Sequence, residues 1–318
     1  MIRFALVPLL ACVLAQPEKA PESPRAAEPD LRGGAVAFEA STPAALEVKR
    51  VKTGHLLVKP VVNGISPGWF IFDTGAGICV ISTPHVKDLD LKDAGPIDAS
   101  GVGGHAKLHL YRARTMTLGP AKFEDHPLME TDLSFLSPLM GEEIAGVIGY
   151  GVLSRCIAEM DLATPRIALH DRDGYTLPRG EWSELVMQQR IPSVRASFEG
   201  HDGVFRLDTG SDAFVTFHEP AVKRWNLLEG RDVKSIKLGG VGGFVKGKEG
   251  IIEWFEIGGV RQEKVKASFA IEPKGSYGES SKDGNIGAAM LKPFTLVLDY
   301  TGNHIAFLKR DPAATDKR

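Results

Sequence analysis

The chain has little cysteine, almost no net charge and no sustained helical pattern. Its three cysteines in 318 residues are too few for a disulfide-built scaffold. A formal net charge of −2 gives no overall field that would attract nucleic acid or an anionic membrane surface. We therefore exclude nucleic acid as an expected partner. A membrane is expected as a partner only through a lipid anchor.

Glycine, in contrast, is abundant. The chain has 35 glycines, above the usual share of about 7%. Together with the scarcity of long helical patterns, this excess indicates a β-rich chain with many turns. The length allows one large hydrophobic core or two medium ones.

The first fifteen residues resemble an export segment. Arg3 is followed by an apolar stretch, residues 4–14, that is shorter than the about 20 residues of a membrane span. Two processing sites compete: a small-residue site before Gln16, and a lipobox-like Leu-Leu-Ala-Cys that would make Cys12 the lipidated residue. Either choice predicts an exported protein, periplasmic or extracellular and possibly lipid-anchored at Cys12.

Residues 16–45 are rich in Pro, Ala and Glu and have no apolar period. This composition predicts a flexible tether, with an inhibitory propeptide as the open alternative. Folding is expected to begin near Leu46. Cys79 and Cys156 lie in apolar sequence, which favours two buried free thiols over a disulfide.

A short stretch occurs twice in the chain. Residues 70–77 read Phe-Ile-Phe-Asp-Thr-Gly-Ala-Gly, and residues 205–211 read Phe-Arg-Leu-Asp-Thr-Gly-Ser. Strand-forming residues stop at Asp-Thr-Gly, where glycine permits a tight turn. Each copy thus predicts a strand that ends on an aspartate, Asp73 in the first and Asp208 in the second.

Two later features repeat in the same order. Asp73 and Asp208 are 135 residues apart, whereas Gly149 and Gly287, each after an isoleucine, are 138 apart. The acidic residues of two later extended segments, Asp161 and Asp299, are also 138 apart. Such a long, nearly constant offset predicts a duplicated domain. We expect one lobe over residues 46–179, a second over 180–310, and a polar tail over 311–318.

Two similar lobes tend to pack about an approximate two-fold axis. If the turns lie at that axis, Asp73 and Asp208 face each other, and two adjacent carboxylates share one proton. One group then acts as a general base and the other as a general acid around a water molecule. The sequence predicts hydrolysis of an amide bond at this site.

These motifs resemble those of bilobal aspartic peptidases of the pepsin and retropepsin type, in a compact exported bacterial form. The resemblance covers about residues 50 to 308 and implies an all-β fold of two pseudo-symmetric, six-stranded-barrel-like lobes with the active site at the lobe interface. It implies a monomeric endopeptidase that acts on peptides or proteins and uses no cofactor or metal. The residues it implies are the catalytic pair Asp73 and Asp208, the dyad-supporting residues Thr74, Gly75, Ala76, Thr209, Gly210 and Ser211, and the flap residues Gly103, Gly104, Gly242 and Gly243.

The chain departs from the family pattern in places. Each lobe is short for a pepsin, and glycine clusters occur in both halves, as in the symmetric flaps of retropepsin dimers. Asn285 stands where the second supporting motif usually has an apolar residue, and Tyr111 is a flap tyrosine by position only. After Asp-Thr-Gly, the first copy has Ala76 and the second Ser211. A Ser211 hydroxyl that donates to Asp208 would keep Asp208 ionised and leave the proton on Asp73.

The sequence is also compatible with other classes of protein and of site. The main one is a bilobal peptide-binding protein of the same fold that does not cleave. Actin-like phosphate-binding folds also carry duplicated Asp-x-Gly turns, but they need long helices between strands. The glycine clusters lack a complete phosphate-binding pattern. His105 and His109 have helical metal-ligand spacing but lie in an expected hairpin, which favours a solvated face.

Overall fold

The computed structural model describes residues 4–6, 31, 33–101, 104–240 and 243–310. Several sequence predictions lie outside these residues. They are most of the export segment with Cys12, the first part of the tether, Gly103, Gly242 and the tail.

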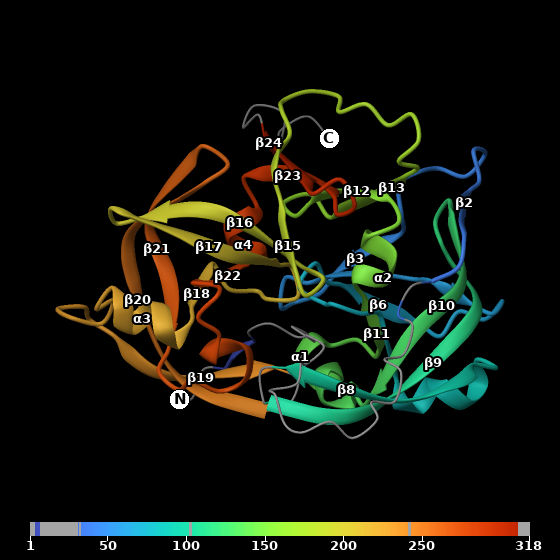
Figure 1. Cartoon of the computed structure of the whole chain (residues 1–318), viewed down its shortest axis with the longest axis horizontal. Helices are drawn as coiled ribbons and strands as arrows, with labels where there is room; N and C mark the ends of the chain where they lie inside the picture. Colours follow the sequence, from blue (N-terminus) through green and yellow to red (C-terminus); the bar gives the residue numbers. More distant parts are fainter. Residues whose placement is uncertain (1–3, 7–30, 32, 102–103, 241–242, 311–318) are drawn as a thin grey trace, which may run out of the picture.

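The protein has two β-rich lobes side by side (Figure 1). The sheet of the first lobe has the order β3-β4-β6-β11-β7-β10-β9-β5, with β2 paired to β10 and β8 to β9. Its strands are β2 (Val36–Phe38), β3 (Val48–Arg50), β4 (Leu56–Val58), β5 (Val61–Val62), β6 (Trp69–Phe72), β7 (Val80–Ser82), β8 (Lys92–Gly101), β9 (Gly104–Leu118), β10 (Ala121–Thr131) and β11 (Ile144–Ile148).

The second lobe repeats this arrangement. Its sheet has the order β1-β19-β20-β21-β18-β22-β17-β16-β15, and a further pairing of β20 with β16 curls it toward a barrel. The run β16-β17-β22-β18-β21-β20 matches β4-β6-β11-β7-β10-β9 strand for strand, so the duplicated all-β fold is confirmed. The strands are β1 (Phe4–Leu6), β15 (Val186–Gln188), β16 (Ile191–Phe198), β17 (His201–Asp208), β18 (Val215–Phe217), β19 (Lys234–Gly240), β20 (Gly243–Ile257), β21 (Val260–Ala270) and β22 (Gly284–Gly287).

A third sheet joins the two lobes. It has the order β13-β12-β23-β24-β14, and its central antiparallel pair brings together β12 from the first half and β23 from the second. The predicted acidic segments supply these strands: Asp161 ends β12 and Asp299 ends β23. The strands are β12 (Ile157–Asp161), β13 (Arg166–His170), β14 (Ser183–Glu184), β23 (Phe294–Asp299) and β24 (His304–Lys309).

Helices are short and lie between strands. In the part of the chain that the structure describes, no helix is both long enough and apolar enough to cross a membrane. The α-helices are α1 (Ser137–Met140), α2 (Tyr150–Leu153), α3 (Glu219–Arg224) and α4 (Ala288–Leu291), and the 3-10 helices are η1 (Thr83–Asp88), η2 (Ser134–Leu136) and η3 (Gly275–Gly278).

The first lobe begins before Leu46, within the segment expected to be a tether. Residues 36–38 form β2, which pairs with β10, and Gly34 N donates to Glu124 O at 2.8 Å. Leu31 is buried against the first lobe's core. This part of the segment is therefore packed on the lobe, because its alternation of Ala, Val and Phe extends the sheet despite the polar residues before it.

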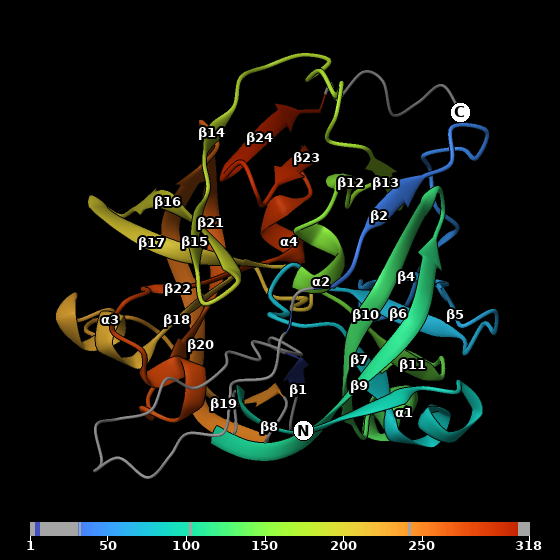
Figure 2. The same ribbon diagram turned by 45° about the vertical axis from the view of Figure 1, so that its right-hand side comes forward.

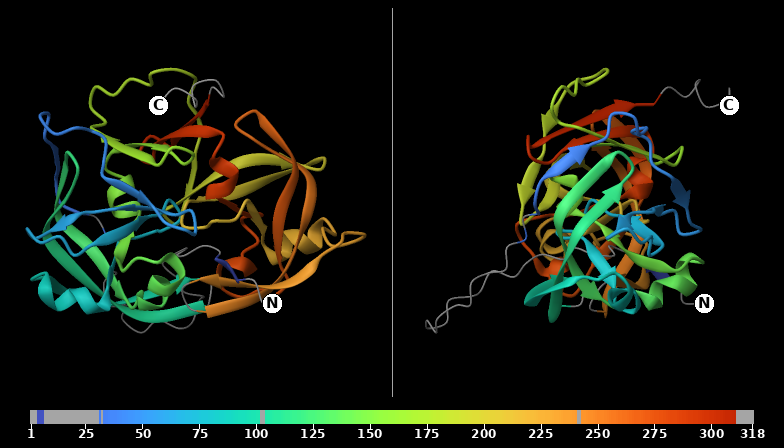
Figure 3. Two further views of the ribbon diagram at one scale, coloured as in Figure 1. Left: turned by 180° about the vertical axis from the view of Figure 1, so that it is seen from behind. Right: turned by 90° about the vertical axis from the view of Figure 1, so that its right-hand side faces the viewer.

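Two long hairpins extend on the same side of the molecule. β8 and β9 form one and β19 and β20 the other, and they approach each other in Figures 1 and 2 and in the left view of Figure 3. The first hairpin also contacts η3 of the second lobe. Both hairpins end in the predicted glycine clusters, since Gly101 pairs with Gly104 and Gly240 with Gly243.

The interior is apolar, and its cysteines are free. One core cluster of Leu, Val, Ile, Phe and Met side chains extends through both lobes, and a second fills the first lobe beneath its hairpin. Cys79 and Cys156 are buried free thiols, as the sequence favoured. Burial raises the pKa of Cys156 to about 12, which keeps this thiol protonated.

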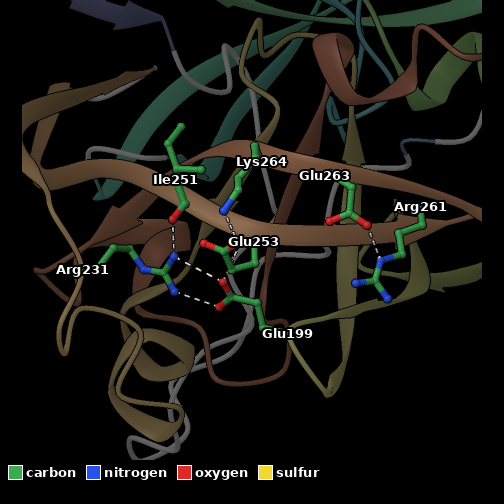
Figure 4. Close-up of polar contacts among 7 residues, drawn as sticks. All are labelled: Glu199, Arg231, Ile251, Glu253, Arg261, Glu263 and Lys264. Carbon is green, nitrogen blue, oxygen red and sulfur yellow. Dashed lines mark hydrogen bonds and ion pairs between the residues drawn. The ribbon is translucent and has the colours of Figure 1, made fainter.

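The outer face of the second lobe carries ion pairs (Figure 4). Arg231 binds the Glu199 carboxylate, with Nη2 at 2.8 Å from Oε2, and also donates to Ile251 O. Glu199 accepts in turn from Glu253 N at 2.7 Å, so this half-buried pair joins the β16–β17 turn to β20. The more exposed pairs Arg261–Glu263 and Lys264–Glu253 are of the kind that contributes little to stability.

Candidate active site

Each Asp-Thr-Gly turn follows a strand that pairs with a parallel neighbouring strand. β11 pairs in parallel with β6, and Asp73 N donates to Ile148 O at 2.9 Å. In the second lobe β22 pairs in parallel with β17 and sets Asp208 opposite Gly287. The two supporting strands thus hold both aspartates at strand ends, where their side chains lie between the lobes.

Glycine in each turn is required by the opposite lobe's carboxyl group. A Cβ atom on Gly75 would lie 2.9 Å from Asp208 Cγ, and one on Gly210 would lie 2.3 Å from Asp73 Oδ2. Neither space can hold a methyl group. The two turns therefore meet across the lobe interface, with each glycine against the other lobe's aspartate.

The two threonines link the turns reciprocally. Thr74 N donates to Thr209 Oγ1 at 3.0 Å, and Thr209 N donates to Thr74 Oγ1 at 3.1 Å. Each hydroxyl then donates onward to the other lobe, Thr74 to Leu207 O and Thr209 to Phe72 O, both at 2.9 Å. All four bonds are buried, so they fix the register of one lobe against the other.

The two carboxylates have different donors. Asp73 Oδ1 accepts from Gly75 N at 2.7 Å and from Gly210 N at 3.1 Å. Asp208 Oδ2 accepts from Asn285 Nδ2 at 3.1 Å. Among the described residues, Asp73 Oδ2 and Asp208 Oδ1 have no hydrogen-bond partner. One oxygen of each carboxyl group is therefore buried without a hydrogen bond, and a bound water molecule or substrate would supply the missing partner.

Burial shifts both acids toward the neutral form. It raises the pKa of Asp73 to about 7, against the backbone N–H groups of Gly75, Gly210 and Ala76, which favour its charge. Burial, and then the charge of Asp73, raise the pKa of Asp208 well above its usual range, although Arg206 and Asn285 act in the opposite direction. The two groups titrate as a pair, and when they share one proton the charge is better stabilised on Asp73, which accepts from two backbone N–H groups.

The expected role of Ser211 is wrong. Its hydroxyl accepts from Ala213 N at 3.3 Å, and none of the bonds found among the described residues joins it to Asp208. The donor to Asp208 is Asn285, and the backbone donors converge on Asp73. The proton is thus favoured on Asp208, the reverse of what the Ala76/Ser211 difference suggested. The backbone carbonyls of Ala76 and Ser211 instead accept hydrogen bonds from the segments that follow the supporting strands. The donors are Tyr150 N to Ala76 O and Ala288 N to Ser211 O, both at 2.8 Å.

Gly104 and Gly243 lie at the hairpin tips, each paired across its turn. Gly243 has φ of 122°, a conformation that glycine adopts readily and other residues rarely do. Tyr111 lies on β9 opposite Asp93 and Leu128, well down the hairpin from its tip.

Sequence reasoning did not find three buried polar side chains at the dyad. His55 Nε2 lies 2.9 Å from Gly210 O, and Tyr300 donates its hydroxyl to Thr74 O at 3.0 Å. His218 Nε2 lies 2.9 Å from Asn285 Oδ1. Burial lowers the pKa of His55 to about 4, so its Nε2–H donates as a neutral imidazole near neutral pH. No local motif marks these residues, because each bonds a partner that is distant in the chain, at separations of 155, 226 and 67 residues.

A sequence model of the aspartyl protease family matches the chain twice, at residues 58–152 and at residues 194–289. Each match contains one Asp-Thr-Gly turn and its supporting strand. The chain belongs to the aspartyl protease family. Since the matches fall one in each lobe, the protein is a bilobal aspartic protease of the pepsin and retropepsin type. No curated protein matches the chain.

The possible histidine metal site has another explanation. His109 Nε2 binds the exposed Asp93 carboxylate at 2.6 Å across the β8–β9 hairpin. In the ranges that the structure describes, no group of three or more His, Cys, Asp or Glu side chains is arranged to hold a metal ion.

Proposed function

We propose that the protein is an aspartic endopeptidase in which Asp73 is the general base and Asp208 the general acid. The observation that carries the proposal is the pair of carboxyl oxygens without partners, Asp73 Oδ2 and Asp208 Oδ1, between lobes locked by the two threonines. One proton shared by two adjacent carboxyl groups provides an acid and a base at the same pH.

The reaction runs through two proton transfers. Asp73 Oδ2 takes a proton from water as the water oxygen bonds to the peptide carbonyl carbon, and Asp208 Oδ1–H protonates the carbonyl oxygen. In the second step Asp73 returns its proton to the amide nitrogen as the C–N bond breaks, and Asp208 recovers a proton from the intermediate's hydroxyl. Both aspartates end in their starting states.

A peptide-library experiment tests this proposal. The protein is incubated with a mixed peptide library from pH 3 to pH 9, a range that spans the raised pKa of Asp73, and products are identified by mass spectrometry. Cleavage is expected for the wild type, with loss of about 10³-fold or more for Asp73→Asn and Asp208→Asn. Asp171→Asn, which neutralises an exposed turn carboxylate, is the matched control and should retain activity.

Peptide binding without cleavage at every pH would instead show that the protein is a peptide-binding protein of the same fold that does not cleave. Hydroxylamine distinguishes the mechanism: direct attack by water yields no hydroxamate, whereas a covalent acyl intermediate would yield one.

We also propose that the protein is exported and acts on peptides outside the cytoplasm as a monomer. The support is the sequence of residues 1–15, with its basic start, apolar stretch and two processing sites. Mass spectrometry of the mature N-terminus tests this: a start at Gln16 indicates release, a diacylated Cys12 indicates a lipid anchor, and an intact Met1 contradicts export. Light scattering of the mature protein tests the monomer.

A further inference from the structure

A buried polar row crosses the second lobe's sheet at the level of Asn285. The strand register sets five side chains opposite one another, and residues directly opposite project from the same face. All are buried: Ser193, Arg206, Asn285, Thr216 and Ser268, on β16, β17, β22, β18 and β21.

The first lobe has the same row in apolar form. Its members occupy the same positions in the same strand order and are fully buried: Leu57, Ile71, Val147, Val80 and Met129. The duplicated fold thus has hydrocarbon at this level in the lobe of Asp73 and polar side chains in the lobe of Asp208, and of the five polar residues Asn285 is the one bonded to Asp208. Val147 and Asn285 are the equivalent pair nearest the carboxylates.

Asn285 contacts the dyad directly and is itself held. It is 1% exposed, and its Nδ2 donates to Asp208 Oδ2 at 3.1 Å. Its Oδ1 lies 2.9 Å from Nε2 of His218, a fully buried imidazole. Burying an amide and an imidazole costs free energy unless both are hydrogen-bonded, and these two bond each other.

The state of His218 fixes the orientation of the amide. Burial and the nearby Arg206 lower the pKa of His218 to about 3, so the ring is neutral. Its Nε2–H donates to Asn285 Oδ1, which leaves the Asn285 amino group facing Asp208. The backbone N–H of His218 in turn donates to Asp283 O at 2.9 Å. The His218 ring lies edge-on against the Tyr277 ring, with 5.8 Å between the ring centroids.

We propose that Asn285, oriented by His218, is a positioning residue that fixes the Asp208 carboxyl group with Oδ2 bound and Oδ1 presented to substrate. The inference rests on the proposed acid role of Asp208. It explains why the two oxygens of Asp208 are not equivalent: Oδ2 accepts from the amide, so the proton resides on Oδ1, which has no partner among the described residues.

Other groups also face Asp208. Asp73 carries the like charge, and the Arg206 guanidinium lies two residues earlier on β17, where Glu279 pairs with it. The phenols of Tyr277, on η3, and Tyr300, after β23, sense the charge of Asp208, and burial raises the pKa of both well above its usual range. These groups are unchanged in variants of Asn285, so the effect of the amide can be measured by itself.

The test exchanges Asn285 for the residue that the first lobe has in its place. Asn285→Val removes the donor, which raises the pKa of Asp208 because its charged form loses a hydrogen bond. We expect the alkaline limb of the kcat profile to move up by about one pH unit and kcat to fall about 10-fold, with little change in KM. Thr216→Val, in the same row but with no bond to Asp208, is the matched control and should leave the profile unchanged.

Variants of His218 test the orientation separately. His218→Leu should shift the same limb in the same direction, whereas His218→Gln, which keeps an N–H donor, should restore part of the wild-type profile. The two His218 variants also test the proposal if Asn285→Val does not fold. An alkaline limb that stays fixed while kcat falls, or an acid limb that moves instead, would overturn the proposal.

A readout without activity separates this inference from the proposed function. In protein labelled with ¹³C at the aspartate carboxyl carbons, NMR titration should show the Asp208 signal moving to higher pKa in Asn285→Val. If the wild type cleaves nothing and this shift is present, the endopeptidase proposal fails and the positioning role stands. If cleavage is normal and the shift is absent, the positioning role fails alone.

Discussion

The backbone N–H of Gly210 donates to Asp73 Oδ1, so a turn of the second lobe holds the carboxylate of the first. On the opposite side of that turn, Gly210 O lies 2.9 Å from His55 Nε2 of the first lobe. The geometry of the dyad is therefore a property of the interface, because neither lobe completes it alone.

The first prediction concerns this contact. Gly210→Ala would place a methyl group 2.3 Å from Asp73 Oδ2, so the turn or the carboxylate must move. We expect kcat/KM for peptide cleavage to fall at least about 10²-fold, since such displacements of reacting groups have effects of this size. Circular dichroism and thermal unfolding should show a folded protein. Wild-type activity in a folded Gly210→Ala variant would contradict the described geometry.

The second prediction concerns the threonine link. Thr74→Val and Thr209→Val each leave a buried N–H of the other turn without its acceptor, at a cost of about 1–3 kcal/mol in the free energy of unfolding. Because the two bonds belong to one network, the double variant should lose less than the sum of the single losses. Urea unfolding of the three variants measures both effects.

Thr216→Val is the control for the threonine link. The buried Thr216 hydroxyl has no hydrogen-bond partner among the described residues, so its removal should cost little or nothing. A loss as large as that of Thr74→Val would assign the effect to packing and not to the link between the lobes.

The third prediction concerns stability at neutral pH. The Asp73 and Asp208 carboxyl groups both have a folded-state pKa raised above that of the unfolded chain. Their contribution to the free energy of unfolding is therefore favourable below about pH 4 and is lost as pH rises toward 7. Asp208→Asn removes the like-charge pair and keeps a group that can accept from Asn285. It should be more stable than the wild type by about 1–3 kcal/mol at pH 7.5. At pH 4 the two should be nearly equal, and urea unfolding at both values checks this; an equal difference at the two values would contradict it.

The fourth prediction concerns acid stability. Burial lowers the folded-state pKa of His55 to about 4, so its contribution is complete above about pH 6.5 and is lost as pH falls toward 4. His55→Gln keeps a donor for Gly210 O but does not titrate. Between pH 7 and pH 4 the free energy of unfolding of this variant, measured by urea unfolding, should fall by about 1–3 kcal/mol less than that of the wild type. His304→Gln, on an exposed strand position, should behave as the wild type.

The duplicated architecture was predictable because each half repeats its own local signals. Alternating strands, a turn glycine and an apolar-Gly motif recur in order, and the strand orders of the two lobes match as a result. The closeness of Gly75 and Gly210 to the opposite aspartates follows from the same motif, since the turn needs glycine on both sides of the axis.

The division of roles within the dyad was not predictable in this way. Ser211 follows the motif directly, yet its hydroxyl binds Ala213 N within its own turn. Asn285 lies 77 residues from Asp208 and reaches it only because β22 pairs with β17. The signal in the sequence was that Asn285 is polar at a position where an apolar residue is usual. No feature of the sequence pointed to His218. The segment before Leu46 was also misjudged, because its Pro and Ala content hides the short strand that joins β10.

The sheet shared by the lobes bears on the spacing of the dyad. Spreading the lobes apart would break the antiparallel register between β12 and β23, from Ala158 opposite Leu298 to Asp161 opposite Thr295. Lifting the two glycine-tipped hairpins leaves that register intact. The distance between the two halves of the dyad is therefore set by a continuous β-sheet of the chain itself and does not depend on the position of the hairpins.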